Sequence, residues 1–464
     1  VLDNCGICGG DNTDCTDCSG EVGGSATVDM CGICTGGNTG ITACIQDCEG
    51  AWGGLATDCG TVTDIDGNEI LDCMNNFTSL IHGHAHPDIV DAVSRQAALG
   101  SAYAAPSMNQ IELAELITER VSSIDKMRFC SSGTEGTLMA LRCARAATGR
   151  QKIMKMEGGY HGSYELAEVS LVPLPDQRGD LEAPNSLAVD GSFPDSVLND
   201  TVICPYNEPA MAKKLIGQHA DDLAAVIVEP ILGSMGMVSA TTEFLNTLRE
   251  ETLKHGIVLI FDEVITLRVD MGGAQKVHGI EPDLSSMGKI IGGGLPVGGV
   301  GGKDELMQLF SPDSAHPVMH ASTFSGNALT MAAGFAAMNA YSSSECARIN
   351  EMADRLRKGF TRAFEQAGIK GQVTGMGSLS NLHFTDEPIH DARDSLTGMI
   401  AAGHVSRLLH LTMIRHGVML ASRLMCCVST AMTDEHIERA ITALNESLAE
   451  IRPFIENERP ALMR

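Results

Sequence analysis

Two apolar runs in the middle of the chain place the strongest constraint on its fold. Residues 224–229 (AAVIVE) and 256–262 (GIVLIFD) are rich in β-branched residues and do not alternate between apolar and polar side chains. Strands of this kind are buried on both faces, as in a parallel sheet covered by helices. The residues between them, 241–255, have helical periodicity. The sequence therefore predicts an α/β fold with a mostly parallel, mixed sheet.

The alternation of strands and helices extends over most of the chain. A turn at 64–68 (DIDGN) joins two short predicted strands, because Asp-Gly supports a positive φ. Further elements are predicted as helices at 111–121, 134–150 and 328–341 and as a strand at 152–156. From residue 342 onward the pattern changes to long polar helices at 344–367 and 433–451 with short strands between them, which favours a smaller α+β domain. The predicted division is a Cys/Gly/Asp-rich repeat segment at 1–60, the N-terminal part of the small domain and a linker at 61–105, a large domain at 106–341, and a C-terminal small domain at 342–464.

Residues 1–60 differ in kind from the rest of the chain. They hold nine of the 16 cysteines and no basic residue, since the first lysine or arginine is Arg95. The string DNCGIC at 3–8 recurs as DMCGIC at 29–34, and such repeats bury too little apolar surface to fold unaided. Three kinds of cross-link could stabilise the segment: disulfides, calcium bound by Asp and Asn oxygens, or zinc bound by Cys-x-x-Cys pairs. A fourth interpretation is a flexible appendage without a catalytic role. The segment looks like acidic cysteine repeats of extracellular proteins, which favours disulfides.

Charge and hydropathy exclude two classes of partner. A net charge of -27 argues against non-specific binding to the phosphate backbone of nucleic acids. No apolar run is long enough to span a bilayer, so no membrane association is expected. No signal peptide is visible after Val1.

Four local features could assemble one site beyond the carboxyl ends of the strands. Residues 130–135 (CSSGTE) open a helix, where backbone N–H groups and a glycine suit a phosphate. Asp262 ends an apolar strand, where a carboxylate can pair with a protonated ring nitrogen. Lys289 lies among glycines and isoleucines, so its amine would be poorly hydrated, its pKa lowered and its nucleophilicity raised. Tyr160 and His161 follow a strand-like run, and an aromatic face there can stack on a planar ring. Alone, the helix opening is more often a simple N-cap, Asp262 an ordinary strand-end acid, and the Tyr-His pair part of the core or a turn. At Lys289 the flanking isoleucines and glycines disfavour a solvated surface lysine. Together the four features predict a cofactor site.

These strings resemble those of the class III (fold-type I) pyridoxal-phosphate (PLP) aminotransferases, particularly the glutamate-1-semialdehyde aminomutase-like branch. The resemblance covers the chain from about residue 64 to its C-terminus. The matching strings, in order, are HGHAHP at 82–87, SSGTE at 131–135, GGYHG at 158–162, VEP at 228–230, FDEV at 261–264, GKIIGGGLP at 288–296 and TFSGN at 323–327. The fold implied is the PLP-dependent transferase fold type I, with a large domain built on the mixed sheet and a smaller α+β domain.

The resemblance also implies roles for single residues. Lys289 is expected to form the Schiff base with PLP and to carry the proton in catalysis, with Asp262 on the pyridinium nitrogen and Tyr160 stacked on the ring. The remaining expected cofactor contacts are Ser132, Gly133 and Thr134 at the phosphate, Val264 on the other ring face, His161 and Glu229 nearby, and Thr323 at the phosphate site of the neighbouring subunit. Members of this family are homodimers with shared active sites. No metal-binding residue is assigned.

The implied reaction moves an amino group between an amino acid, possibly a β-amino acid, and a keto acid or aldehyde. In the aminomutase branch a tryptophan usually occupies the position of Phe77, and Ser234 replaces an asparagine. A glutamate expected in a C-terminal loop is absent from 417–426 (GVMLASRLMC), where related aminotransferases carry an arginine. Arg423 is therefore expected to bind a substrate carboxylate, with Phe77 also at the substrate.

Two alternatives and the compartment stay open at this stage. Glutamate-1-semialdehyde 2,1-aminomutase is the alternative reaction, and a non-catalytic binding protein on the same fold is the alternative of another class. The cysteine repeats occupy the place of residues that help to roof the active site in the family. They also suggest an oxidising or secretory context, whereas enzymes of this type are usually cytoplasmic, so no compartment is predicted.

Overall fold

The computed structural model of the protein describes residues 27–28, 34–35, 60–315 and 317–464. Near the N-terminus it describes one antiparallel pair, β1 (Thr27–Val28) with β2 (Cys34–Thr35). The disulfide, calcium and zinc interpretations of residues 1–60 lie outside the described residues.

The core of the large domain is a seven-stranded sheet in the order β5-β15-β14-β13-β10-β6-β9. Its strands are β5 (Lys126–Cys130), β6 (Lys152–Met156), β9 (Thr201–Cys204), β10 (Leu223–Val228), β13 (Val258–Asp262), β14 (Leu284–Gly288) and β15 (Gly298–Gly302). Only β15 runs antiparallel to its two neighbours in this sheet. Every residue of β10 and of β13 is buried. The predicted α/β class and the mixed, mostly parallel sheet are therefore confirmed.

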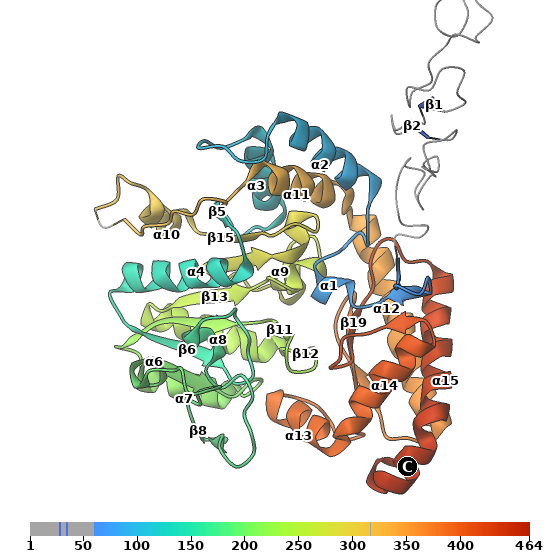
Figure 1. The fold of residues 1–464 in the computed structure, drawn as a ribbon. Coiled ribbons are helices and arrows are strands. Elements are labelled where there is room, and N and C mark those ends of the chain that lie inside the picture. The colour runs from blue at the N-terminus through green and yellow to red at the C-terminus, as the bar shows by residue number, and fades with distance from the viewer. Residues whose placement is uncertain (1–26, 29–33, 36–59, 316) are drawn as a thin grey trace, which may run out of the picture.

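Helices cover both faces of this sheet (Figure 1). On one face α4 (Gly133–Thr148) packs against the side chains of Ile227 and Ile260. On the other face α7 (Pro209–Gln218) and α8 (Thr242–His255) pack against neighbouring residues of the same strands. The alternation of side chains along a strand sends them to opposite faces, so a strand between two helical layers is apolar throughout.

Further helices complete the large domain. The longer ones, α2 (Pro87–Leu99), α3 (Met108–Arg120) and α11 (Ala328–Ala340), pack together beside β5 (Figure 1). The shorter elements are α5 (Glu165–Glu168), α6 (Asp195–Asp200), α9 (Gly273–His278), α10 (Asp304–Met307), the 3-10 turns η1 (Thr266–Arg268), η2 (Lys289–Gly292) and η3 (Gln308–Phe310), and the strand pairs β7 (Gly179–Asp180) with β8 (Ala183–Pro184) and β11 (Ile231–Leu232) with β12 (Val238–Ser239).

The small domain combines two short sheets with long helices. Its elements are α12 (Ser343–Ala367), α13 (Ala392–Ala402), α14 (His404–Arg415), α15 (Asp434–Glu458) and η4 (Pro460–Leu462), with β16 (Gln372–Thr374), β17 (Leu379–His383) and β19 (Met425–Cys427) in one sheet and β3 (Thr61–Thr63), β4 (Glu69–Asp72) and β18 (Val418–Met419) in the other. The β3–β4 hairpin forms around the predicted Asp-Gly turn, and β4 pairs in parallel with β18. Helix α15 ends later than the predicted residue 451, because Ile455 continues its buried stripe.

A left-handed turn precedes the large domain. In α1 (Asn75–Thr78) the four φ angles are 48°, 46°, 52° and 75°, although none of these residues is glycine. Such a backbone costs roughly 1–2 kcal/mol per residue. The surroundings hold the turn in place: Asp72 accepts the N–H groups of Met74 and Asn75 at 2.9 Å, and the buried Arg268 donates to the carbonyl oxygen of Thr78 at 3.0 Å.

A buried ion pair joins the two domains. Arg393, in the first turn of α13, donates through Nε and Nη2 to the two carboxylate oxygens of Glu157, at 2.6 and 3.0 Å. Glu157 directly follows β6, and Gly158 beside it leaves no room for a Cβ atom next to Ala392. The small domain is thus docked at the carboxyl end of β6, the strand next to the edge strand β9. Among the described residues, no helix is both long enough and apolar enough to cross a membrane.

Candidate active site

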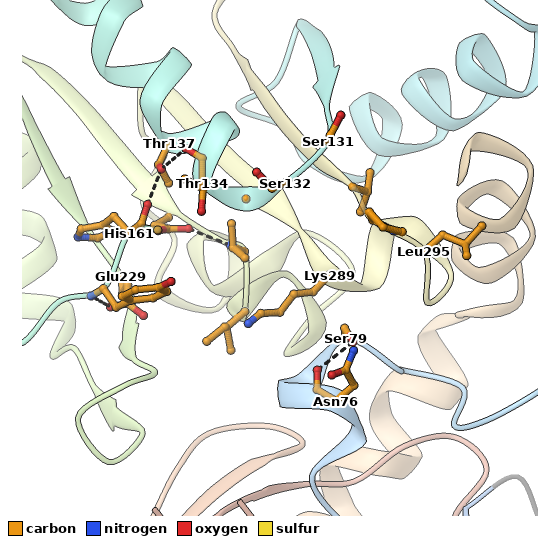
Figure 2. Close-up of a pocket in the computed structure, with 18 of the residues that line it drawn as sticks. Asn76, Ser79, Ser131, Ser132, Thr134, Thr137, His161, Glu229, Lys289 and Leu295 are labelled. Carbon is orange, nitrogen blue, oxygen red and sulfur yellow. Dashed lines mark hydrogen bonds and ion pairs between the residues drawn. The ribbon is translucent and has the colours of Figure 1, made fainter. Parts of the chain in front are cut away.

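A cavity of about 400 Å³ opens beyond the carboxyl ends of β10 and β13. This volume is within the usual range for small-molecule sites. Figure 2 shows Lys289 extending into the cavity, with His161 and Glu229 on one side and Asn76 and Ser79 on another. The cavity brings together nine of the predicted site residues: Ser132, Gly133, Thr134, Tyr160, His161, Glu229, Asp262, Val264 and Lys289.

The carboxylate of Asp262 is buried and held by three donors or partners. One oxygen, Oδ2, lies 2.8 Å from Nδ1 of His161. The other, Oδ1, accepts from the hydroxyl of Ser286 at 2.9 Å and from the N–H of Val264 at 3.1 Å. Burial lowers the pKa of His161, while its hydrogen bond to Asp262 opposes that shift. Hydrogen bonds to both oxygens therefore fix the orientation of the carboxylate.

Lys289 begins the short turn η2 after β14 and has a left-handed backbone with φ of 50°. Its side chain is partly buried in the cavity, whose lining also includes the apolar side chains of Val264 and Ile265. This burial lowers the pKa of Lys289, and the negative charges of Asp262 and Glu229 act in the opposite direction. A larger fraction of the amine is unprotonated than for a solvated lysine, which favours nucleophilic attack.

The start of α4 forms one end of the cavity. Ser132 is the N-cap and accepts the N–H of Glu135 at 3.2 Å, so the first helical amides, which have no intrahelical acceptor, point toward the cavity. Ser131 also lines the cavity, and its hydroxyl oxygen is buried with no hydrogen-bond partner among the described residues. Gly162 has φ of 111° and lies so close to Thr134 that a Cβ atom would be 2.6 Å from its Oγ1. These groups fit a phosphate.

Glu229 ties the Tyr160 loop to the end of β10. Its two oxygens accept the N–H groups of Tyr160 at 2.8 Å and Gly233 at 3.0 Å. Burial, together with the nearby charge of Asp262, raises the pKa of Glu229 to about 8. Glu229 therefore acts on the site through the backbone that it holds.

A second hollow of about 440 Å³ adjoins the first and shares Tyr160, Ile265 and Lys289 with it. Both predicted substrate residues line it: Phe77 from the left-handed turn, and Arg423 from the loop before β19. Arg423 is exposed and donates from Nη1 to the carbonyl oxygen of Ser234 at 3.2 Å. The other walls are mostly apolar, formed by Leu171, Met237, Ile265, Ala421 and Met425.

Thr323 is the one predicted site residue that lines neither hollow. It is exposed on the loop before α11. The sequence reasoning also missed several lining or supporting residues, namely Asn76, Ser79, Ser131, Thr137 and Ser286. Ser286 lies three residues before Lys289, and this position was a usable signal for a residue near the site. In the structure its strand is parallel to that of Asp262, and its register partner is Asp262 itself.

The family model for class-III aminotransferases matches residues 56–448. The chain belongs to this family. Glutamate-1-semialdehyde 2,1-aminomutase 2 of Brevibacillus brevis is 42% identical over 393 residues, which cover 83% of this chain and 88% of that protein.

Two solved transaminase structures are also similar. An omega-transaminase from Sphaerobacter thermophilus has a TM-score of 0.81 and 43% identity, and covers 85% of this chain and 90% of its own. A β-phenylalanine aminotransferase from Variovorax paradoxus has a TM-score of 0.75 and 32% identity, and covers 87% of each chain. These matches confirm the class III resemblance and the fold-type I architecture, and the chain is an enzyme of a PLP-dependent family.

Proposed function

We propose that this class III aminotransferase binds PLP in the first cavity and uses Lys289 as its covalent attachment point. The observation that carries the proposal is the placement of a desolvated amine, a buried carboxylate and a helix N-terminus around one cavity. When bound, PLP supplies the electron sink for amino transfer. Lys289 moves a proton at the reacting carbon, because its amine is the basic group that reaches into the cavity.

The other residues orient and hold the cofactor. Asp262 pairs with the ring nitrogen, and His161 and Ser286 fix its carboxylate. The amides at Gly133 and Thr134 and the hydroxyl group of Ser132 bind the phosphate. Tyr160 and Val264 contribute to the walls on which the ring packs. Spectroscopic titration of the purified protein with PLP, followed by borohydride reduction and peptide mapping, tests the proposal; a label on a residue other than Lys289 would contradict it.

The residues that line the second hollow support the proposal that the amino donor is an amino acid and the acceptor a keto acid or aldehyde. A single exposed guanidinium at one wall and mostly apolar side chains elsewhere suit a substrate with one carboxylate and an apolar side chain, and a β-amino acid is within this class. Arg423 is proposed to bind that carboxylate in exchange for the carbonyl oxygen of Ser234.

Glutamate-1-semialdehyde 2,1-aminomutase is the second candidate, favoured by the 42% identity to such an enzyme. A half-reaction screen separates the two candidates. α- and β-amino acids are added singly to the PLP form, and the change in cofactor absorbance is followed. Conversion by apolar amino acids favours the aminotransferase, whereas a response to glutamate-1-semialdehyde or to 4,5-diaminovalerate alone favours the aminomutase.

A homodimer with shared active sites is proposed from the surface beside the first cavity. A groove of about 450 Å³ adjoins it through Ser131, Leu295 and Pro296, and Phe324 in this groove is 60% exposed. Exposed apolar residues around a groove are typical of an interface. Thr323, next to Phe324, would then reach the partner's phosphate site.

Complementation tests this arrangement. Lys289→Ala and Thr323→Val chains are assayed separately and after mixing and subunit exchange. Activity above that of either variant alone is expected, because a mixed dimer contains one site with both wild-type residues. A monomer by light scattering would contradict the proposal.

A further inference from the structure

A lysine with no part in the proposed chemistry is sealed inside the large domain beside the active site. Lys155, in β6, is 0% exposed. Its Nζ donates to the carbonyl oxygen of Gly159 at 2.8 Å and to that of Val169 at 2.5 Å. Lysine is almost never fully buried unless its charge is compensated. Burying Lys155 therefore has a free-energy cost that its contacts must offset.

The two acceptors lie at the two ends of one segment. Residues 159–169 leave the carboxyl end of β6, carry Tyr160 and His161 into the cavity, form α5 and return. The N–H of Gly158 also donates to the carbonyl oxygen of Ser170 at 2.9 Å, just outside the same two ends. The ammonium group of Lys155 therefore closes the segment into a loop held at its base.

Nearby carboxylates explain how an ammonium group is tolerated there. Burial lowers the pKa of Lys155 to about 7, while Glu229, Glu157 and Glu168 oppose that shift. Arg393 already pairs with both oxygens of Glu157. Glu229 is 4% exposed and is the carboxylate that also accepts the N–H of Tyr160. Lys155 and Glu229 thus hold the same loop, one at its base and one next to the aromatic ring.

We infer that Lys155 is a positioning residue of the active site, which ties both ends of residues 159–169 to β6 and so holds Tyr160 and His161 in the cavity. Its effect on catalysis rests on the proposed function. Its effect on the loop depends only on the hydrogen bonds to Gly159 and Val169.

Hydrogen exchange followed by mass spectrometry tests the inference on the full chain, with and without added PLP. Lys155→Met keeps the length and removes the donors. Exchange of the amides in 158–170 is expected to rise roughly tenfold or more, because the two hydrogen bonds that hold the base of this segment are lost. Exchange in α8 and β13 is expected to stay as in the wild type. Lys152→Met is the matched control, since Lys152 lies in the same strand but pairs with the exposed Asp222.

Kinetics and cofactor binding supply the second readout. In Lys155→Met the Kd for PLP is expected to rise, and kcat is expected to fall more than the KM of the amino donor rises, because the displaced residues border the cofactor and not the substrate hollow alone. Lys155→Gln, which retains one donor without charge, is expected to give an intermediate exchange rate.

Three outcomes would overturn the inference. The first is unchanged exchange in 158–170 in Lys155→Met. The second is an equal rise throughout the large domain. The third is global unfolding of both Lys155→Met and Lys155→Gln, which would show a general role in the core. If instead the wild-type protein fails to bind PLP or to transfer amino groups, the proposed function fails, while the exchange comparison still decides the role of Lys155 in holding the loop.

Discussion

The two sides of the active site are built from different kinds of structure. On the cofactor side, Asp262 ends the central strand β13 and Lys289 follows β14, and the Asp262 carboxylate is buried with a hydrogen bond on each oxygen. On the substrate side, Phe77 and Arg423 come from a strained turn and a loop, and both are exposed. Rigid strand ends suit chemistry that tolerates little displacement, and loops suit contacts that differ between substrates. Changes on the first side should therefore abolish the reaction, and changes on the second should redirect it.

Replacing Lys289 is expected to have the largest effect on the reaction. Lys289→Ala removes the amine that attaches the cofactor and moves the proton, so kcat is expected to fall on the order of 10⁴-fold or more. Covalent capture of PLP, measured by borohydride reduction and intact-mass analysis, should disappear. Lys303→Ala, at a lysine outside the cavity, should retain capture. Persistent capture in Lys289→Ala would contradict the assignment.

Asp262→Asn is expected to lower kcat about 10²–10³-fold, because a fixed charge at the ring nitrogen is lost. The same variant gives a pH test. The Asp262 carboxylate raises the pKa of Lys289 against the larger lowering by burial. Without that charge, the pKa of Lys289 falls further and the amine stays unprotonated at lower pH. The midpoint of the pH profile for covalent PLP capture should therefore move to lower pH; a shift to higher pH would refute the electrostatic coupling.

Ser286→Ala, which removes one hydrogen bond to Asp262, is expected to lower kcat only about tenfold.

Arg423→Ala should weaken substrate binding alone. The KM for a donor with a carboxylate is expected to rise roughly 10- to 100-fold, as for loss of a charge-assisted hydrogen bond. The KM for a simple amine and the absorbance of bound PLP should not change. Equal increases for both donors would mean that Arg423 does not bind the carboxylate.

The smallest expected effect concerns the backbone of the left-handed turn. Asn76 is exposed with φ of 46°, a conformation that asparagine and glycine adopt more readily than alanine. Asn76→Ala is expected to be less stable than Asn76→Gly by about 1 kcal/mol. Thermal midpoints of the two variants, measured side by side, check this order. The reverse order would show that the turn is not strained at this position.

The same contrast explains what could be predicted from the sequence. The cofactor side follows from local rules: an apolar strand ending in Asp262, a helix opening at Gly133 and a glycine-flanked Lys289 each have one favoured place at the edge of a parallel sheet. The left-handed turn at 75–78 could not be predicted, because its residues contain no glycine and tertiary contacts such as that of Arg268 hold it.

Lys155 shows a different reason for a missed residue. A lysine in a predicted strand at 152–156 was a visible signal, but its meaning depends on carbonyl oxygens that approach only in the folded protein. Thr323 is exposed in this chain, and the role proposed for it would require a second chain, which the sequence of one chain does not specify.

The ion pair between Arg393 and Glu157 has a practical consequence for protein engineering. It anchors the domain that carries Arg423 to the strand that carries Lys155, through two hydrogen bonds shielded from water. A chimera that takes residues 342–464 from a relative with another substrate preference would need to import an arginine at position 393 together with the new specificity loop. A graft lacking it would leave the buried Glu157 without its guanidinium partner, at a cost of several kcal/mol.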